Sequence, residues 1–329
     1  MNANESGSGQ SSTDVGASTA DTMAPSQSTQ VADAIPYGIA PKGYRLPAHT
    51  RLGPVRLQVA DLDRSIAYYE QVLGLHVATL TEDAAALTPQ REDIVILELR
   101  QRRDARAVPR RGRLGLYHYA ILLPDRAALG RFLAHLRDLG AYAGMSDHFV
   151  SEALYLTDPD GLGIEVYADR PRTAWRHEDR QLTMATNPLD VQSVISAAGG
   201  ERWTGMPPGT RIGHVHLYVD DIDRAGAFYH DALGFDKVVW NYPGALFLSA
   251  GGYHHHLGTN TWAAGAPPAT DEDARLLEWT VQVPSLSDAQ AAAGSLEAAG
   301  YSVESAPGSW LATDPWGTRL RLAAADGSQ

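Results

Sequence analysis

The sequence predicts an α+β protein made of four βαβββ modules, arranged as two tandem domains. Two observations support this prediction. The segment "TRLGPVRLQVADLDRSIAYYEQVLGL" (50–75) aligns without a gap on "TRIGHVHLYVDDIDRAGAFYHDALGF" (210–235). A second pair of similar segments, "YLTDPDGLGIEVYAD" (155–169) and "WLATDPWGTRLRLAAAD" (310–326), closes each copy. Repetition of this kind indicates duplicated structural units.

The repeats set the expected domain limits. We expect one domain at 50–170 and the other at 210–325. The segment 171–209 carries Pro, Gly and Trp and is predicted to be a surface linker. Residues 1–45 are predicted to form a disordered polar tail. The tail has neither a basic start nor an apolar stretch, so it does not have the pattern of a signal peptide.

The first domain divides into two modules, called a and b. In module a, "PVRLQVA" alternates as a strand does, Asp61 is placed to cap a helix, and Gly74 is placed to end it. In module b, the strand "GLYHYAILLP" precedes the helix "DRAALGRFLAHLRDLG", which ends on Gly140. Each helix is followed by short strands, such as "IVILELR".

The second domain repeats this order in modules c and d. Module c begins with "GHVHLYV" and has a helix that ends at Gly234, and module d begins with "LEWTVQV" and has a helix that ends at Gly300. A module of this size cannot bury its sheet alone. We therefore expect the modules to pair into curved, half-barrel sheets around a cleft.

Composition limits the function classes. The 329-residue chain has a net charge of −12 with scattered acidic residues, which argues against nucleic acid or an anionic membrane as a partner. Without cysteine, any metal site must use His, Asp or Glu. No apolar run is long enough for a transmembrane helix. We expect a soluble cytoplasmic protein.

The segment "GGYHHHLGTN" (251–260) contains three consecutive histidines. In a strand, His254 and His256 would share one face and His255 would take the other. At least one of them should then point into the space that the strand encloses, but the pattern does not decide which one.

The motifs resemble those of the vicinal oxygen chelate superfamily, which includes glyoxalase I, bleomycin-resistance proteins and type I extradiol dioxygenases. The relevant segments are "GHVHLYVDDIDRAGAFYHDALGF" and "DPDGLGIEVY". Within the superfamily, "YHHHLGTNTW" and "SEALYLTDPDGLGIEVYADRP" resemble catechol 2,3-dioxygenases of the bacillus and actinobacterial kind. The resemblance extends from Arg51 to about Leu322 and implies two tandem vicinal oxygen chelate domains.

The resemblance implies Fe(II), or in some members Mn(II), held by two His and one Glu. The family's ligand positions give a complete set when modules c and b pair, namely His214, His118 and Glu165. This pairing can form within one chain or between two chains.

The same positions in modules a and d fall on Pro54, Glu278 and Arg321. This set cannot hold a divalent ion, although Glu278 and Arg321 are placed to form a salt bridge.

The resemblance also assigns acid–base groups. His255 corresponds to the working acid–base residue and His254 to its neighbour. Tyr155, ten residues before Glu165, corresponds to a Tyr that hydrogen-bonds the metal-bound substrate. His148 lies near a supporting His of the family.

Taken singly, each of these residues has a structural explanation. His118 is then a half-buried strand histidine, Glu165 a solvent-facing charge, Tyr155 a core residue and the histidine run a solvent-facing hairpin. The combination of all ligands in one pairing of modules favours the metal site.

The implied activity is extradiol cleavage of a small aromatic diol by O2, giving a muconic semialdehyde. One alternative is a glyoxalase-like isomerase or lyase, in which a second carboxylate usually replaces the His pair. Another is a metal-free binding or resistance protein. The sequence leaves open whether the chain forms a homo-oligomer.

Overall fold

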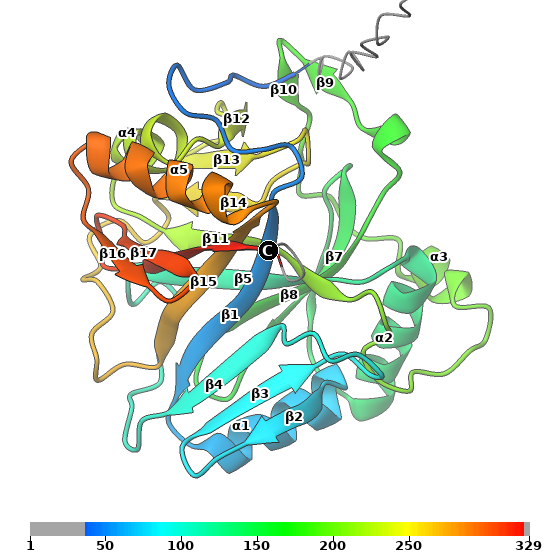
Figure 1. The fold of residues 1–329 in the computed structure, drawn as a ribbon. Coiled ribbons are helices and arrows are strands. Elements are labelled where there is room, and N and C mark those ends of the chain that lie inside the picture. Colours follow the sequence, from blue (N-terminus) through cyan, green and yellow to red (C-terminus); the bar gives the residue numbers. More distant parts are fainter. Residues whose placement is uncertain (1–36, 326–329) are drawn as a thin grey trace, which may run out of the picture. The chain divides into compact units, whose positions relative to one another are not determined.

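The computed structural model describes residues 37–325, which form the four predicted βαβββ modules (Figure 1). Module a comprises β1 (Arg51–Val59), α1 (Leu62–Tyr68), β2 (His76–Leu80), β3 (Ala84–Thr88) and β4 (Leu97–Gln101). Module b comprises β5 (Gly115–Leu122), α2 (Arg126–Leu139), β6 (Gly144–Asp147), β7 (Ser151–Thr157) and β8 (Gly163–Asp169).

The second repeat has the same order of elements. Module c comprises β11 (Arg211–Tyr218), α4 (Ile222–Gly226), β12 (Asp236–Val239), β13 (Ala245–Ser249) and β14 (Leu257–Asn260). Module d comprises β15 (Arg275–Val283), α5 (Leu286–Ala298), β16 (Val303–Ala306), β17 (Ser309–Thr313) and β18 (Arg319–Ala324). The predicted fold class is thereby confirmed.

Each sheet combines one module from each repeat. One eight-stranded sheet has the order β16-β17-β18-β15-β1-β4-β3-β2 and joins module d to module a. The other has the order β12-β13-β14-β11-β5-β8-β7-β6 and joins module c to module b. The first strands of partner modules pair antiparallel, β1 with β15 and β5 with β11, at the centre of each sheet. Modules c and b therefore pair within one chain.

The first helix begins at its predicted cap, Asp61, and the first helix of each repeat changes form before it ends. Asp61 accepts from the backbone N–H of Arg64 at 3.0 Å, which satisfies a donor of the first turn. After α1 the chain continues as a π-helical segment, Tyr69–Leu73, and stops at Gly74, whose φ of 73° suits glycine. Module c has the corresponding π-helical segment Ala227–Ala232. The sequence pattern predicted where these helices end, but it did not predict their π-helical segments.

The repeated "DP" motif and a tyrosine at the matching position of each repeat connect the two modules of each domain. The buried Asp158 carboxylate of module b accepts from the backbone N–H groups of Asp160 and Leu162 at 2.9 and 2.8 Å. It also accepts from the hydroxyl of Tyr69 in module a at 2.9 Å. Burial raises the pKa of Asp158 to about 6, against these hydrogen bonds.

In the second repeat, Tyr229 of module c donates to Asp314 of module d at 2.7 Å. Asp314 is likewise buried and accepts from the backbone N–H of Trp316 at 2.9 Å. The motifs shared by the two repeats therefore have a structural use in both.

Two segments outside the modules are structured. Residues 37–45 were predicted to belong to the tail, but Ile39 and Lys237 exchange backbone hydrogen bonds of 2.8 and 3.0 Å, and Arg45 pairs with Asp236. The prediction of a disordered tail is therefore wrong for residues 37–45, because these contacts attach the segment to the edge strand β12. Residues 1–36 of the predicted tail lie outside the described residues.

The predicted linker, 171–209, contains regular elements of its own. They are a short 3₁₀ turn (Arg172–Ala174), β9 (His177–Glu178), β10 (Gln181–Leu182) and α3 (Val191–Ala197). Helix α3 packs against α2, where a side chain in place of Gly130 would come within 2.2 Å of the Val194 carbonyl oxygen. Glycine therefore allows the two helices to approach closely.

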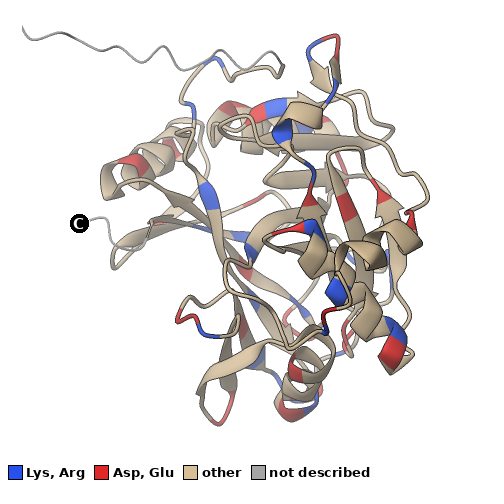
Figure 2. Ribbon diagram, turned by 90° about the vertical axis from the view of Figure 1, so that its right-hand side faces the viewer, with Lys and Arg blue, Asp and Glu red and all other residues tan. Residues whose placement is uncertain are grey.

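Basic and acidic side chains are interspersed over the elements (Figure 2). In the part of the chain that the structure describes, no helix has the length and apolar character needed to cross a membrane.

We predict that Tyr69→Phe lowers the free energy of unfolding by about 1–3 kcal/mol, because it removes a donor from a buried carboxylate. The matched control is Tyr68→Phe at the half-buried neighbouring position, for which we expect a change within about 0.5 kcal/mol. Chemical denaturation of both variants measures the difference. Equal effects of the two substitutions would contradict the connecting role of Tyr69.

Candidate metal centre

Three neighbouring strands of the c–b sheet bring His118, Glu165 and His214 together. His214 on β11 and Glu165 on β8 both lie opposite Ala120 of β5. His118 is two residues from Ala120 and therefore on the same face of β5. The small alanine side chain occupies the middle of the group, and the three larger side chains surround the space above it.

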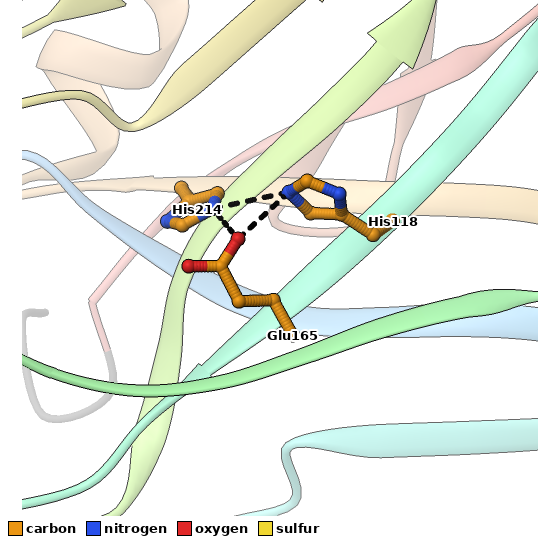
Figure 3. Close-up of side chains that lie close together, drawn as sticks. All are labelled: His118, Glu165 and His214. Carbon is orange, nitrogen blue, oxygen red and sulfur yellow. Dashed lines mark hydrogen bonds and ion pairs between the residues drawn. The ribbon is translucent and has the colours of Figure 1, made fainter. Parts of the chain in front are cut away.

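The three donor atoms converge on one point (Figure 3). The His118 Nε2 and His214 Nε2 atoms lie 3.0 and 3.1 Å from Glu165 Oε2, and 3.3 Å from each other. All three side chains are buried. Ligands on one face of an octahedral ion, with bonds of about 2.1 Å, stand about 3.0 Å apart. The donor set therefore fits a divalent metal ion.

The electrostatics of the cluster suit a cation. Burial raises the pKa of Glu165, but the contacts with His214 and His118 outweigh it and hold this pKa well below its usual range. Burial lowers the pKa of both His118 and His214 by more than Glu165 raises it. The cluster thus offers one carboxylate and two neutral imidazoles, which are the protonation states that metal binding requires.

The corresponding positions of the a–d sheet form an ion pair instead. Arg321 donates to both carboxylate oxygens of Glu278 at 2.6 and 3.0 Å. The predicted salt bridge is confirmed. The fixed guanidinium charge stands where the c–b sheet has Glu165.

The histidine run precedes β14 and does not lie in a strand, so the expected alternation of faces does not apply. All three side chains are buried, which contradicts a solvent-facing hairpin. His255 lines the cavity at the cluster, with its ring 4.0 Å from that of His214. His254 and His256 point to different surroundings.

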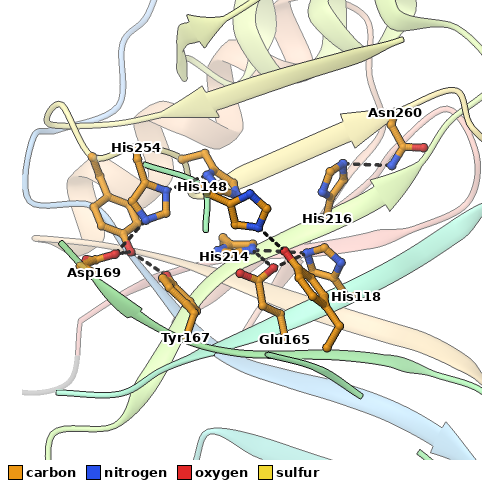
Figure 4. A network of polar contacts seen from close by, with 12 residues as sticks. His118, His148, Glu165, Tyr167, Asp169, His214, His216, His254 and Asn260 are labelled. Atoms are coloured by element: carbon orange, nitrogen blue, oxygen red, sulfur yellow. Dashed lines mark hydrogen bonds and ion pairs between the residues drawn. The ribbon is translucent and has the colours of Figure 1, made fainter. Parts of the chain in front are cut away.

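His254 connects His255 to a carboxylate, and Figure 4 shows His254 beside Asp169. Its Nε2 lies 2.9 Å from Asp169 Oδ1, and its Nδ1 lies 2.7 Å from Nδ1 of His255. Because a carboxylate only accepts, Nε2 of a neutral His254 carries the proton, and its Nδ1 accepts from His255. Nε2 of His255 is then unprotonated. Burial and the nearby His214 lower the pKa of His255 well below its usual range, which keeps this nitrogen a free base.

Tyr155 and His148 form a second polar pair beside the cluster. Nδ1 of His148 lies 2.6 Å from the Ala185 carbonyl and therefore donates to it. Nε2 of His148 lies 2.6 Å from the Tyr155 hydroxyl, and the ring of Tyr155 meets that of His118 edge-on. Burial, reinforced by Glu165, raises the pKa of Tyr155 well above its usual range, so the phenol stays protonated.

A cavity of about 720 Å³ opens onto the cluster. Its wall includes aromatic side chains that the sequence analysis did not assign to the site, namely Tyr117, Tyr218, Tyr242, Phe247 and Trp262. Arg110 and Arg111 add positive charge to the same wall. No local motif marks these residues, because they come from segments that only the fold brings together.

His216 and Gly213 also belong to the surroundings of the cluster. The Nε2 atom of His216 lies 2.9 Å from the amide nitrogen of Asn260 and accepts from it. A Cβ at Gly213 would come within 1.8 Å of the Tyr167 hydroxyl. This glycine next to His214 lets Tyr167 pack against the His214 ring, with ring centroids 4.9 Å apart.

A family model described as the Glyoxalase/Bleomycin resistance protein/Dioxygenase superfamily matches residues 51–166 and 211–321. The chain belongs to this superfamily. A relative named catechol-2,3-dioxygenase, from Bacillus subtilis strain 168, is 45% identical over 270 residues, covering 81% of this chain and 94% of the relative. The resemblance inferred from the sequence, including its catechol-2,3-dioxygenase-like character, is confirmed.

Solved structures support the fold. A putative dioxygenase from Bacillus subtilis superposes with a TM-score of 0.59 at 12% identity, covering 87% of each chain. The CppA protein of Streptococcus pneumoniae superposes with a TM-score of 0.50 at 14% identity, covering 84% of this chain and 98% of that chain. At these identities the likeness concerns the fold alone.

We predict that Glu165→Gln weakens binding of a divalent metal by about 100-fold or more, because it removes the negative charge of the donor set and preserves its size. Competition with a chelator measures the affinity, and circular dichroism checks the fold. The control is Glu178→Gln on the exposed strand β9, which should bind metal as the wild type does. Unchanged affinity in Glu165→Gln would exclude this carboxylate as a ligand.

Proposed function

We propose that the protein cleaves the ring of a catechol-type substrate with O2, beside the two hydroxyl groups, to give a muconic semialdehyde. Fe(II) is the proposed metal, with His118, Glu165 and His214 as ligands. The observation that carries the proposal is the buried cluster of two His and one Glu next to the neutral base His255. The catechol-2,3-dioxygenase relative supports the same reaction.

The three donor atoms lie on one side of the expected metal position. His118, Glu165 and His214 would hold iron(II) from this side, and the bound iron would supply redox chemistry between an electron-rich ring and O2. The aromatic wall of the cavity offers apolar contacts for a planar ring. The charges of Arg110 and Arg111 favour a catechol that has lost one proton.

His255 is the proposed acid–base residue. Its free Nε2 faces the cavity, where it can take a hydroxyl proton from the substrate and later return it. The proton is best held when the Nδ1–H of His255 points to His254, which in turn donates to Asp169. This chain of hydrogen bonds stabilises the positive charge that His255 gains on protonation.

Tyr155 is the proposed hydrogen-bond donor to the substrate. With His148 neutral, the Tyr155 hydroxyl donates to Nε2 of His148, because Nδ1 already carries the proton. An oxygen of a bound substrate would compete with Nε2 of His148 for this hydrogen bond, and the contact with His148 positions the phenol beside the cluster.

A glyoxalase-like isomerase is less compatible with this donor set. Among residues 37–325, Glu165 is the single carboxylate of the metal cluster, and the base beside it is a histidine. The buried cluster also argues against a binding protein that works without metal, since three buried ionisable side chains are costly unless they serve a cation.

The function is tested by loading the purified protein with Fe(II) without oxygen, adding catechol, and then admitting O2. We expect oxygen uptake together with a yellow ring-cleavage product. Protein without metal is the control and should be inactive. Iron-loaded protein that consumes no oxygen with catechol, but isomerises the hemithioacetal of methylglyoxal, would instead support the glyoxalase-like reaction.

We predict that His255→Ala lowers turnover of catechol by about 10²-fold or more, the usual contribution of proton transfer by a positioned side chain. Binding of iron and of catechol should remain near wild-type values, because His255 is not a proposed ligand. Steady-state kinetics and bound-iron analysis separate the two effects. The control is His76→Ala, on the exposed start of β2. Full turnover in His255→Ala would remove this residue from the mechanism.

A further inference from the structure

The third residue of the histidine run faces a cleft separate from the cavity of the metal cluster. His256, Tyr253 and three arginines, Arg51, Arg172 and Arg211, line this cleft of about 420 Å³. Within the described residues, no Asp or Glu lines it. A cleft lined by three arginines and no carboxylate is unusual in a chain of net charge −12, because like charges repel.

His256 supplies a buried donor to the cleft. Its Nδ1 lies 3.2 Å from the backbone nitrogen of Ala250, whose N–H can only donate. Nδ1 is therefore unprotonated, and the proton of the neutral ring sits on Nε2. The side chain is 93% buried, since His256 is 7% exposed. Burial lowers the pKa of His256 to about 3, with His254 and the nearby Arg172 and Arg211 acting in the same direction.

All three arginines are exposed at the cleft; side-chain contacts hold Arg172, and the starts of two strands set the backbone positions of Arg51 and Arg211. The Cζ atom of Arg172 lies 5.5 Å from the ring centre of Trp175 and 5.8 Å from that of Tyr253, and its Nη1 donates to the Gly251 carbonyl. Arg51 and Arg211 are the first residues of β1 and β11, at matching positions of the two repeats. Both follow a threonine whose hydroxyl donates to a proline carbonyl at 2.7 Å, which fixes the start of each strand.

We propose that this cleft binds a small oxyanion, a phosphate or a carboxylate group, between Arg51, Arg172, Arg211 and Nε2–H of His256. Guanidinium groups and a neutral N–H match the acceptor oxygens of such an anion. The anion would offset the mutual repulsion of the three arginines. The volume of the cleft leaves room for an organic substituent on the anionic group. This site is independent of the proposed oxygenase reaction.

The cleft adjoins the chain of hydrogen bonds behind His255. Tyr253 forms part of its wall, and the Tyr253 hydroxyl lies 3.1 Å from Asp169, which also accepts from His254. The histidine run therefore serves three surroundings. His255 faces the metal cluster, His254 connects it to Asp169, and His256 faces the proposed anion site.

The test measures binding of inorganic phosphate, and separately of malonate, to the full-length protein by calorimetry and by thermal unfolding in a phosphate-free buffer. We expect saturable binding of one of the two anions with a rise in Tm. Sodium chloride at equal ionic strength should not reproduce this rise. A preference for phosphate or for malonate identifies the kind of anionic group.

The variant Arg211→Gln should bind the anion about tenfold more weakly or worse, since a charge-assisted hydrogen bond is lost. Without added anion its Tm should equal or exceed that of the wild type, because one repelling charge is gone. The matched control is Arg103→Gln, an exposed arginine outside the cleft, which should bind as the wild type does. Equal stabilisation of wild type and Arg211→Gln, or no saturable binding of either anion, would overturn the proposal.

Discussion

The antiparallel pairing of β5 with β11 is the interaction on which the candidate site depends. It places one histidine from each repeat on the same face of one sheet and puts Glu165 of β8 beside them. Neither repeat contains the three donors by itself. The three donors of the candidate metal site therefore meet only because modules c and b share one sheet and modules a and d share the other.

In the a–d sheet, the positions that correspond to the candidate site carry a different set of side chains. Glu278 and Arg321 meet there as a bidentate ion pair, half enclosed by the sheet. A charge in a low-dielectric interior needs a partner of opposite sign. In the a–d sheet the partner is a side chain, and in the c–b sheet the donor set is arranged for a cation. The equivalent positions of the two sheets thus hold an ion pair in one sheet and a donor set for a cation in the other.

The shared motifs of the repeats and the residues of the candidate site have different physical tasks. Asp158 and Asp314 hold their turns and receive a tyrosine hydroxyl from the neighbouring module, and both domains need this. The histidines at 254–256 occur in the second repeat alone, at a turn between β13 and β14. A turn is not bound to alternate its side chains as a strand does, so three consecutive residues can face three surroundings.

The sequence by itself determined the four modules and the helix cap at Asp61, because periodicity, capping and the internal repeat are local properties. The proposed ligand set His118, Glu165 and His214 followed from the resemblance to a known family, and the structure brings these three residues together. The sequence left open which of the three histidines meets the cluster and whether modules pair within one chain. Tertiary structure decided both, through the burial of His255 against His214 and the antiparallel order of β11 and β5. It also decided what no local pattern records: that Ala185 of the predicted linker orients His148, and that arginines distant in sequence meet at His256. Contacts of this kind depend on the packing of whole modules, and the free energy that selects them is a property of the folded chain rather than of any segment.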